Sequence, residues 1–210
     1  MDKLAIIAGT PVDTQMGVNY IKTRGGYEAI YLPAFDCPRD CHIFQMADDD
    51  YKKEKMQQLF NKAIDQGCSK FFIYCNSLSS AFDYNKLAEE MGVCCVTPLN
   101  AYEKIANKYD KLAVIAANNQ ATCGIEKVFT NVNPSCYVIG LGILSLVEAI
   151  ESKMAPAEIV SKFKLPQLID FFNNAGCQAL VLGCTHFPYF KNQLSGIKII
   201  DPADIMYDLI

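Results

Sequence analysis

Hydrophobic residues fall along this chain in short continuous runs rather than in alternation with polar residues. Such runs are typical of strands that are buried on both faces, as in a parallel sheet. Between them lie longer segments with the spacing of amphipathic helices. Strands are predicted at 4–8, 29–32, 71–74, 93–96, 112–116, 137–140, 179–182 and 197–200, and helices at 51–66, 81–91, 101–108, 120–129, 144–152, 157–174 and after Pro202. The alternation of strand and helix predicts an α/β fold.

The chain also repeats itself. The stretch DKLAIIAG at 2–9 returns as DKLAVIAA at 110–117, and GCSKFFIYCNSL at 67–78 returns as GCQALVLGCTHF at 176–187. Gly67 and Gly176 stand just before the repeated strands, where a glycine that ends a helix is common. We therefore predict two open parallel-sheet domains with helices on both faces, related by a pseudo-twofold axis, over residues 1–97 and 98–201. A closing helix at 202–210 can pack back onto the first domain.

The repeat places Cys75 and Cys184 at equivalent positions, each at the carboxyl end of a predicted strand. Ligands of open α/β sheets bind at that edge, so we expect an active site in the cleft between the domains, with one thiol on each wall. A thiolate is a nucleophile, and it can also act as a base. Two thiols related in this way suit a nearly symmetric reaction, such as moving a proton from one face of a carbon to the other. Cys68 and Cys177 share the repeat at the amino ends of the strands and are expected to be structural.

Composition narrows the class of partner. The 210 residues carry a net charge of −4 and show no cluster of lysine or arginine, which argues against nucleic-acid binding. No apolar run reaches the length of a membrane span and the first residues lack a signal-peptide pattern, so we expect a cytoplasmic protein with no membrane partner. The ten cysteines are then expected to be reduced thiols. The stretch CPRDCH at 37–42 lacks a second ligand pair with zinc-site spacing, so no metal is expected.

Arg39 favours an acidic ligand. It is one of only two arginines in the chain, in which lysine is the usual cation. The planar guanidinium of arginine binds a carboxylate through two parallel hydrogen bonds. A substrate with more than one charged group fits this residue and the polar residues that follow both cysteines.

Two motifs resemble those of a known family. YCNSLS at 74–79 and LVLGCTHFP at 180–188 resemble the paired cysteine motifs of the cofactor-independent aspartate/glutamate racemases, and SLVEAIE at 145–151 and IIDPA at 199–203 resemble glutamate racemases in particular. The resemblance implies a racemase that interconverts L- and D-glutamate, or aspartate, by two-base proton transfer at the α-carbon. It implies no pyridoxal phosphate and no metal, and its partner is a small acidic amino acid. A homodimer is left open.

The resemblance also implies roles for single residues. Cys75 and Cys184 would be the acid/base pair. His186 would assist Cys184, and Glu148 would hold the ring of His186. The substrate's ammonium and carboxylate groups would be bound by Thr10, Arg39, Asn76, Ser77 and Thr185.

The first strand departs from the family pattern. Glutamate racemases carry Asp-Ser-Gly after this strand, where the chain has Gly9-Thr10-Pro11. Thr10 can replace the serine as a hydrogen-bond donor, but the aspartate is missing. Asp13 is a candidate to support Cys75 in its place, or to cap the helix that follows.

Two alternatives stay open. Hydantoin racemases, maleate isomerases and arylmalonate decarboxylases share the duplicated architecture that the resemblance implies. A two-lobed binding protein that closes on an acidic metabolite without turnover is the alternative from another class, and the missing aspartate keeps it open.

Overall fold

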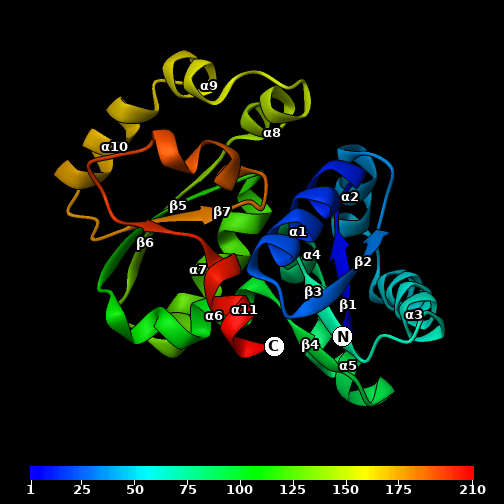
Figure 1. The fold of residues 1–210 in the computed structure, drawn as a ribbon. Coiled ribbons are helices and arrows are strands. Elements are labelled where there is room, and N and C mark those ends of the chain that lie inside the picture. Colours follow the sequence, from blue (N-terminus) through cyan, green and yellow to red (C-terminus); the bar gives the residue numbers. More distant parts are fainter. The chain divides into compact units, whose positions relative to one another are not determined.

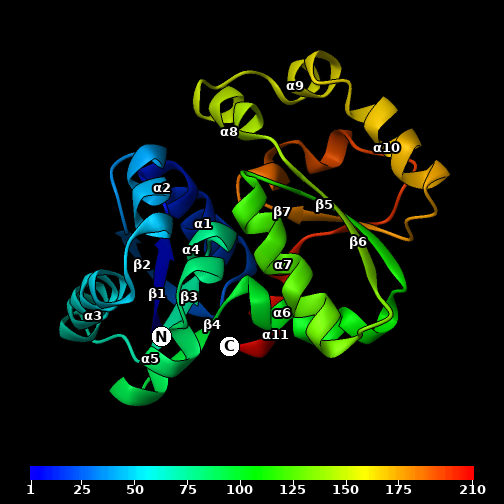
Figure 2. The ribbon, with the colours of Figure 1, turned by 180° about the vertical axis from the view of Figure 1, so that it is seen from behind.

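The computed structural model describes residues 1–210. They divide into two compact units, one formed by Met1–Asn100 with Met206–Ile210 and the other by Ala101–Ile205. Each unit holds a four-stranded sheet whose strand pairs are all parallel. Helices flank each sheet (Figures 1 and 2). The predicted α/β class with two parallel-sheet domains is confirmed.

The first unit is built around strand β1. The elements are β1 (Asp2–Ala8), α1 (Pro11–Arg24), β2 (Tyr27–Pro33), α2 (Pro38–Met46), α3 (Asp49–Asp65), β3 (Lys70–Ile73), α4 (Asn76–Ala81), α5 (Tyr84–Met91), β4 (Cys94–Val96) and the first residues of α6 (Pro98–Ile105), which continues into the second unit. The strand order is β2-β1-β3-β4, so the chain leaves β1 to one side for β2 and returns on the other side for β3. The order of the sheet therefore reverses between β1 and β3, and loops diverge at the carboxyl ends of these two strands.

The second unit repeats this plan. Its elements are η1 (Ala106–Lys108), β5 (Lys111–Ala116), α7 (Asn119–Val132), β6 (Tyr137–Gly142), α8 (Leu144–Glu151), α9 (Pro156–Lys162), α10 (Leu165–Asn174), β7 (Leu180–Gly183), η2 (Phe187–Gln193), β8 (Ile199–Ile200) and the first half of α11 (Pro202–Leu209). The order β6-β5-β7-β8 matches that of the first sheet strand for strand. Its order reverses between β5 and β7.

The central strands are the most deeply buried parts of both units. In β1, residues 4–8 are buried, and in β5 residues 112–116 are buried. Helices on both faces of a sheet remove both sets of alternating side chains from water, which explains why these strands are apolar throughout. The last helix also contributes to the first unit, because the Tyr207 hydroxyl donates to the carbonyl of Gly25 at 3.0 Å. None of the helices combines the length and the apolar character that a membrane crossing requires.

A helix cap and two glycines take the roles that the sequence indicates. The Asp48 carboxylate caps α3 by accepting a hydrogen bond from the backbone N–H of Tyr51 at 2.8 Å. Gly67 and Gly176 have φ angles of +85° and +81°, a conformation that glycine adopts without strain. Both glycines turn the chain from a helix into the strand that carries a candidate cysteine.

The structure differs from the prediction in several helices. The helix predicted at 157–174 is two helices, α9 and α10, because Lys164 takes a left-handed conformation with φ of 54° and Pro166 follows. The helices α2 and α4 lie where no helix was predicted, and α1, expected only as a helix following Asp13, begins at Pro11. The buried face of α1 includes polar Asp13 and Thr14, and α2 buries only Phe44, so neither segment shows a clear apolar stripe.

Candidate active site

Each candidate cysteine lies where the strand order of its sheet reverses. Cys75 follows the end of β3, beside the end of β1, with which β3 pairs. Cys184 follows β7 directly, beside the end of β5. Both residues are buried, each with 7% of its surface exposed. The two units thus present a thiol at the same place of the same sheet topology.

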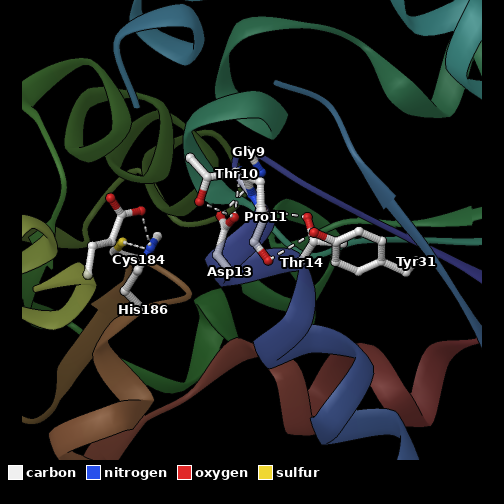
Figure 3. A network of polar contacts seen from close by, with 9 residues as sticks. Gly9, Thr10, Pro11, Asp13, Thr14, Tyr31, Cys184 and His186 are labelled. Carbon is white, nitrogen blue, oxygen red and sulfur yellow. Dashed lines mark hydrogen bonds and ion pairs between the residues drawn. The ribbon is translucent and has the colours of Figure 1, made fainter. Parts of the chain in front are cut away.

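In the first unit, the carboxylate of Asp13 turns back to the end of β1 (Figure 3). It accepts hydrogen bonds from the backbone N–H of Thr10 at 2.6 Å, from the Thr10 hydroxyl at 3.0 Å, and from the N–H of Gly9 at 3.2 Å. Asp13 is only 2% exposed, and three donors offset the cost of burying its charge. Thr10 is also buried and is the N-cap residue of α1.

The position of Gly9 shows how close Asp13 comes to Cys75. A β-carbon at Gly9 would lie 3.5 Å from Oδ2 of Asp13 and 3.5 Å from Sγ of Cys75. It would also lie 2.7 Å from Sγ of Cys41, a residue on α2 that the sequence analysis considered only as a possible metal ligand. The carboxylate and the two thiols therefore surround the space that a side chain at position 9 would fill.

Cys75 is held by the start of α4, for which it is the N-cap residue. Its carbonyl accepts from the hydroxyl of Ser79 at 2.7 Å and from the N–H of the same residue at 3.1 Å. Asn76 is buried, and Ser77 is part-buried with its carbonyl accepting from Nε2 of Gln45 at 3.3 Å. This last bond ties α4 to α2 and so fixes the backbone next to Cys75.

In the second unit, His186 connects Cys184 to a carboxylate (Figure 3). Nδ1 of the ring lies 3.6 Å from Sγ of Cys184, and Nε2 lies 3.2 Å from Oε1 of Glu151. His186 is 4% exposed and lies directly before η2, whereas Glu151 is the last residue of α8. The arrangement of a thiol, a ring and a carboxylate resembles the nucleophile, base and orienting group of thiol enzymes.

The contact expected of Glu148 is made by Glu151 instead. Glu148 lies on α8 and is exposed, and its backbone carbonyl accepts from Ser152 at 2.9 Å. Glu151 lies three residues after Glu148 on the same helix. Three residues are almost one turn, so the two side chains lie on the same face, and Glu151 is nearer the end of the helix. Both acids belong to the SLVEAIE stretch, and the sequence alone does not show which of them reaches the ring.

The remaining predicted residues lie as follows. Thr185 is 5% exposed between Cys184 and His186. Arg39 is exposed in the first turn of α2, the helix that carries Cys41. Asn118 occupies in the second unit the place that Thr10 has in the first, and its side chain caps α7 by accepting from the N–H of Ala121 at 2.9 Å. No group of three or more histidine, cysteine or acidic side chains is arranged to hold a metal ion.

These features define a class of protein: a duplicated α/β protein with a buried thiol where the strand order of each parallel sheet reverses, and with buried polar side chains nearby. Glutamate racemases are similar to the chain in sequence. The glutamate racemase of Limosilactobacillus reuteri is 27% identical over 163 residues, which are 72% of this chain and 60% of the relative. No protein-family model matches the chain.

Solved structures share the fold across the whole chain. The glutamate racemase of Francisella tularensis, in complex with D-glutamate, matches with a TM-score of 0.73 at 16% identity over 99% of this chain and 79% of that one. An aspartate racemase homologue from Pyrococcus horikoshii matches with a TM-score of 0.66 at 15% identity over 100% and 97% of the two chains. The chain is therefore similar in sequence to glutamate racemases, and it shares its fold with glutamate racemases and with an aspartate racemase homologue. The matched segment spans 60% of the length of the relative from L. reuteri.

Proposed function

We propose that this protein is a cofactor-independent amino-acid racemase that interconverts L- and D-glutamate. The observation that carries the proposal is the pair of buried thiols, Cys75 and Cys184, at equivalent sheet edges of two repeated units. The names of the sequence relatives, which are glutamate racemases, support glutamate over aspartate. The substrate class is a small acidic amino acid.

The proposed reaction moves one proton at a time. The thiolate of one cysteine takes the hydrogen of the α-carbon, and the electron pair of that bond passes into the α-carboxylate. The thiol of the other cysteine then gives its proton to the opposite face of the same carbon. After one turnover the two cysteines have exchanged their protonation states. This requires both sulfur atoms to reach one α-carbon from opposite faces in the catalytic state.

The hydrogen-bonding residues beside the thiols have a second task. The planar intermediate places extra negative charge on the α-carboxylate, and donors held at fixed positions stabilise that charge better than mobile water does. We assign this role, and the binding of the substrate's ammonium and carboxylate groups, to the polar residues next to the two cysteines: Thr10, Asn76, Ser77 and Thr185. Arg39 lies on α2 with its side chain exposed and is proposed to recognise a substrate carboxylate.

The supporting groups differ between the thiols. His186 is proposed to act as the proton acceptor for Cys184, with Glu151 orienting its ring. Asp13 is proposed to support Cys75, because a β-carbon at Gly9 would lie 3.5 Å from its Oδ2 and also 3.5 Å from Sγ of Cys75. The role first expected of Glu148 passes to Glu151 because of the ring contact described above.

Proton exchange at the α-carbon tests the proposal directly. Purified protein is incubated with L-glutamate, and separately with L-aspartate, in D₂O without added cofactor, and the α-hydrogen is followed by NMR while the optical rotation is recorded. The wild-type protein is expected to replace the α-hydrogen of glutamate by deuterium and to reduce the rotation to zero. Cys75→Ala and Cys184→Ala are each expected to lose racemisation, and each can retain exchange of one enantiomer.

Cys68→Ala and Cys177→Ala are matched controls, because these cysteines belong to the same repeat at the other end of the same strands. Burial raises the pKa of both thiols, so neither is a good base near neutral pH. Both controls are expected to racemise normally. Full racemase activity in Cys75→Ala or Cys184→Ala would refute the two-base assignment, and tight binding of glutamate without exchange would favour the binding-protein alternative.

A further inference from the structure

Cys41 fills a space that the sequence opens at the end of β1. Gly9 does not have the positive φ angle that commonly requires glycine. What requires glycine here is space, because a β-carbon at position 9 would lie 2.7 Å from Sγ of Cys41, closer than such atoms come in proteins. The same point is 3.5 Å from Sγ of Cys75. A residue with a side chain at position 9 would displace Cys41 from its place beside Cys75.

The Cys41 thiol stays protonated. Burial raises its pKa far above the ordinary range of a thiol, and the negative charges of Cys75, Asp13, Asp40 and Cys37 raise it further. A thiol that does not ionise is a poor attacking group in disulfide exchange, so Cys41 is not suited to forming a redox pair with Cys75. A neutral thiol is instead a hydrogen-bond donor, although a weak one.

A donor is useful at this place because negative charges meet there. Within the first unit, the titratable groups facing Cys75 are Asp13 on α1, Cys41 on α2 and Tyr84 on α5. Burial raises the pKa of the Tyr84 phenol, and its hydroxyl donates to Sδ of Met56 at 3.1 Å. Ionising Cys75 therefore creates a second negative charge close to the buried carboxylate of Asp13, which is unfavourable unless a neighbouring dipole offsets it.

We propose that Cys41 is a positioning residue for Cys75, whose neutral S–H group occupies the space left by Gly9 and stabilises the Cys75 thiolate. This role rests on the proposed use of Cys75 as a base. Gly9 and Cys41 then form a complementary pair, in which the glycine admits the thiol. The departure from Asp-Ser-Gly at 9–11 therefore has a physical consequence: the space that Gly9 leaves is occupied by the Cys41 thiol, which is a hydrogen-bond donor.

The test measures the ionisation of Cys75 without using racemisation, so that its result is separate from the proposed function. The rate of iodoacetamide reaction at Cys75 is followed against pH by mass spectrometry of the peptide that contains it. In Cys41→Ala the midpoint of this profile is expected to rise by about one pH unit, the size expected for losing a hydrogen bond to a charged group. In Cys41→Ser, which keeps a donor, the midpoint is expected to stay near that of the wild type. Cys37→Ala, on the same turn of chain, is the matched control.

A second comparison tests the fit between Gly9 and Cys41. Gly9→Ala is expected to shift the Cys75 profile because its new methyl group displaces Cys41, whereas Gly9→Ala combined with Cys41→Ala is expected to resemble Cys41→Ala alone. Circular dichroism of each variant confirms that it is folded. An unchanged midpoint in Cys41→Ala, an equal shift in Cys41→Ser, or simple addition of the two shifts in the double variant would overturn the proposal. If the profile shifts as expected but neither the wild type nor any variant racemises glutamate, the proposed function fails, while the effect of Cys41 on the ionisation of Cys75 stands.

Discussion

Replacing Glu151 tests the chain of contacts behind Cys184. Nε2 of His186 lies 3.2 Å from the Glu151 carboxylate and so carries the ring proton when the imidazole is neutral. Nδ1, 3.6 Å from Sγ of Cys184, is then left with a lone pair that can accept the thiol proton. Without Glu151 the ring can take the other tautomer, in which the nitrogen facing Cys184 is no longer an acceptor.

The expected loss follows from the strength of this contact. Hydrogen bonds to charged groups contribute about 1.5–3 kcal/mol, and we take the lower end because the Glu151 side chain is 22% exposed. A loss of about 1.4 kcal/mol in the transition state lowers the rate about tenfold. Glu151→Ala is therefore expected to reduce kcat about tenfold. Glu151→Gln keeps an oxygen acceptor without the charge and is expected to lose less.

The assay must separate an effect on Cys184 from general damage. The two enantiomers of glutamate have equal free energies, so kcat/KM is the same in both directions for every variant and does not reveal which thiol is affected. The primary isotope effect with α-deuterated substrate does reveal it. Slowing proton transfer at Cys184 raises the isotope effect for the enantiomer that Cys184 deprotonates, and lowers it for the enantiomer that Cys75 deprotonates.

Glu148→Gln completes the comparison. Glu148 is exposed on the same helix and does not make the ring contact, so this variant is expected to stay within about twofold of the wild type. A fall of tenfold in Glu148→Gln together with a normal Glu151→Ala would contradict the assignment. Isotope effects that change equally for both enantiomers would show that Glu151 does not act through Cys184.

Two further substitutions test how the second unit is held. Gly183→Ala would place a β-carbon 2.6 Å from Cδ1 of Ile125. Such overpacking is expected to lower the free energy of unfolding by about 1–3 kcal/mol and to slow the alkylation of Cys184. Urea unfolding that matches the wild type would count against this packing. The Asp201 carboxylate accepts hydrogen bonds from Nζ of Lys191 at 3.0 Å and from the N–H of Ala203 in the first turn of α11. Asp201→Ala removes both bonds and is expected to lower the free energy of unfolding in urea by about 1–2 kcal/mol, whereas Asp201→Asn is expected to lower it less.

The repeat explains how much of the fold the sequence predicts. Two pairs of similar segments, one at the start of each unit and one at each candidate cysteine, determine which strands correspond, and the structure gives both sheets the same strand order. The start and extent of α1 were not predicted because its inner face holds polar Asp13 and Thr14. The break between α9 and α10 depends on the backbone of Lys164, which the apolar spacing of 157–174 does not reveal.

The candidate site shows a sharper limit. The thiols follow strands whose pattern is readable, so their places were predictable from spacing alone. The supporting groups depend on contacts between distant segments: Glu151 meets a ring 35 residues further along the chain, and Cys41 lies against Gly9. Helical spacing leaves Glu148 and Glu151 as near neighbours on one face, so only the packing of α8 near η2 decides between them.

Duplication gave the two units the same sheet edge but not the same support for the thiol. Cys184 has an imidazole and a carboxylate in series, whereas Cys75 has a buried carboxylate and a neutral thiol beside it. Such asymmetry is compatible with a reaction whose substrate and product are mirror images, because it cannot change the equilibrium between them. It can only change which of the two proton transfers is slower. If the proposed racemase reaction holds, its rate depends on the higher of the two barriers and not on which groups stand behind each thiol, so Gly9-Thr10-Pro11 with Asp13 and Cys41 is compatible with the same reaction as an Asp-Ser-Gly stretch.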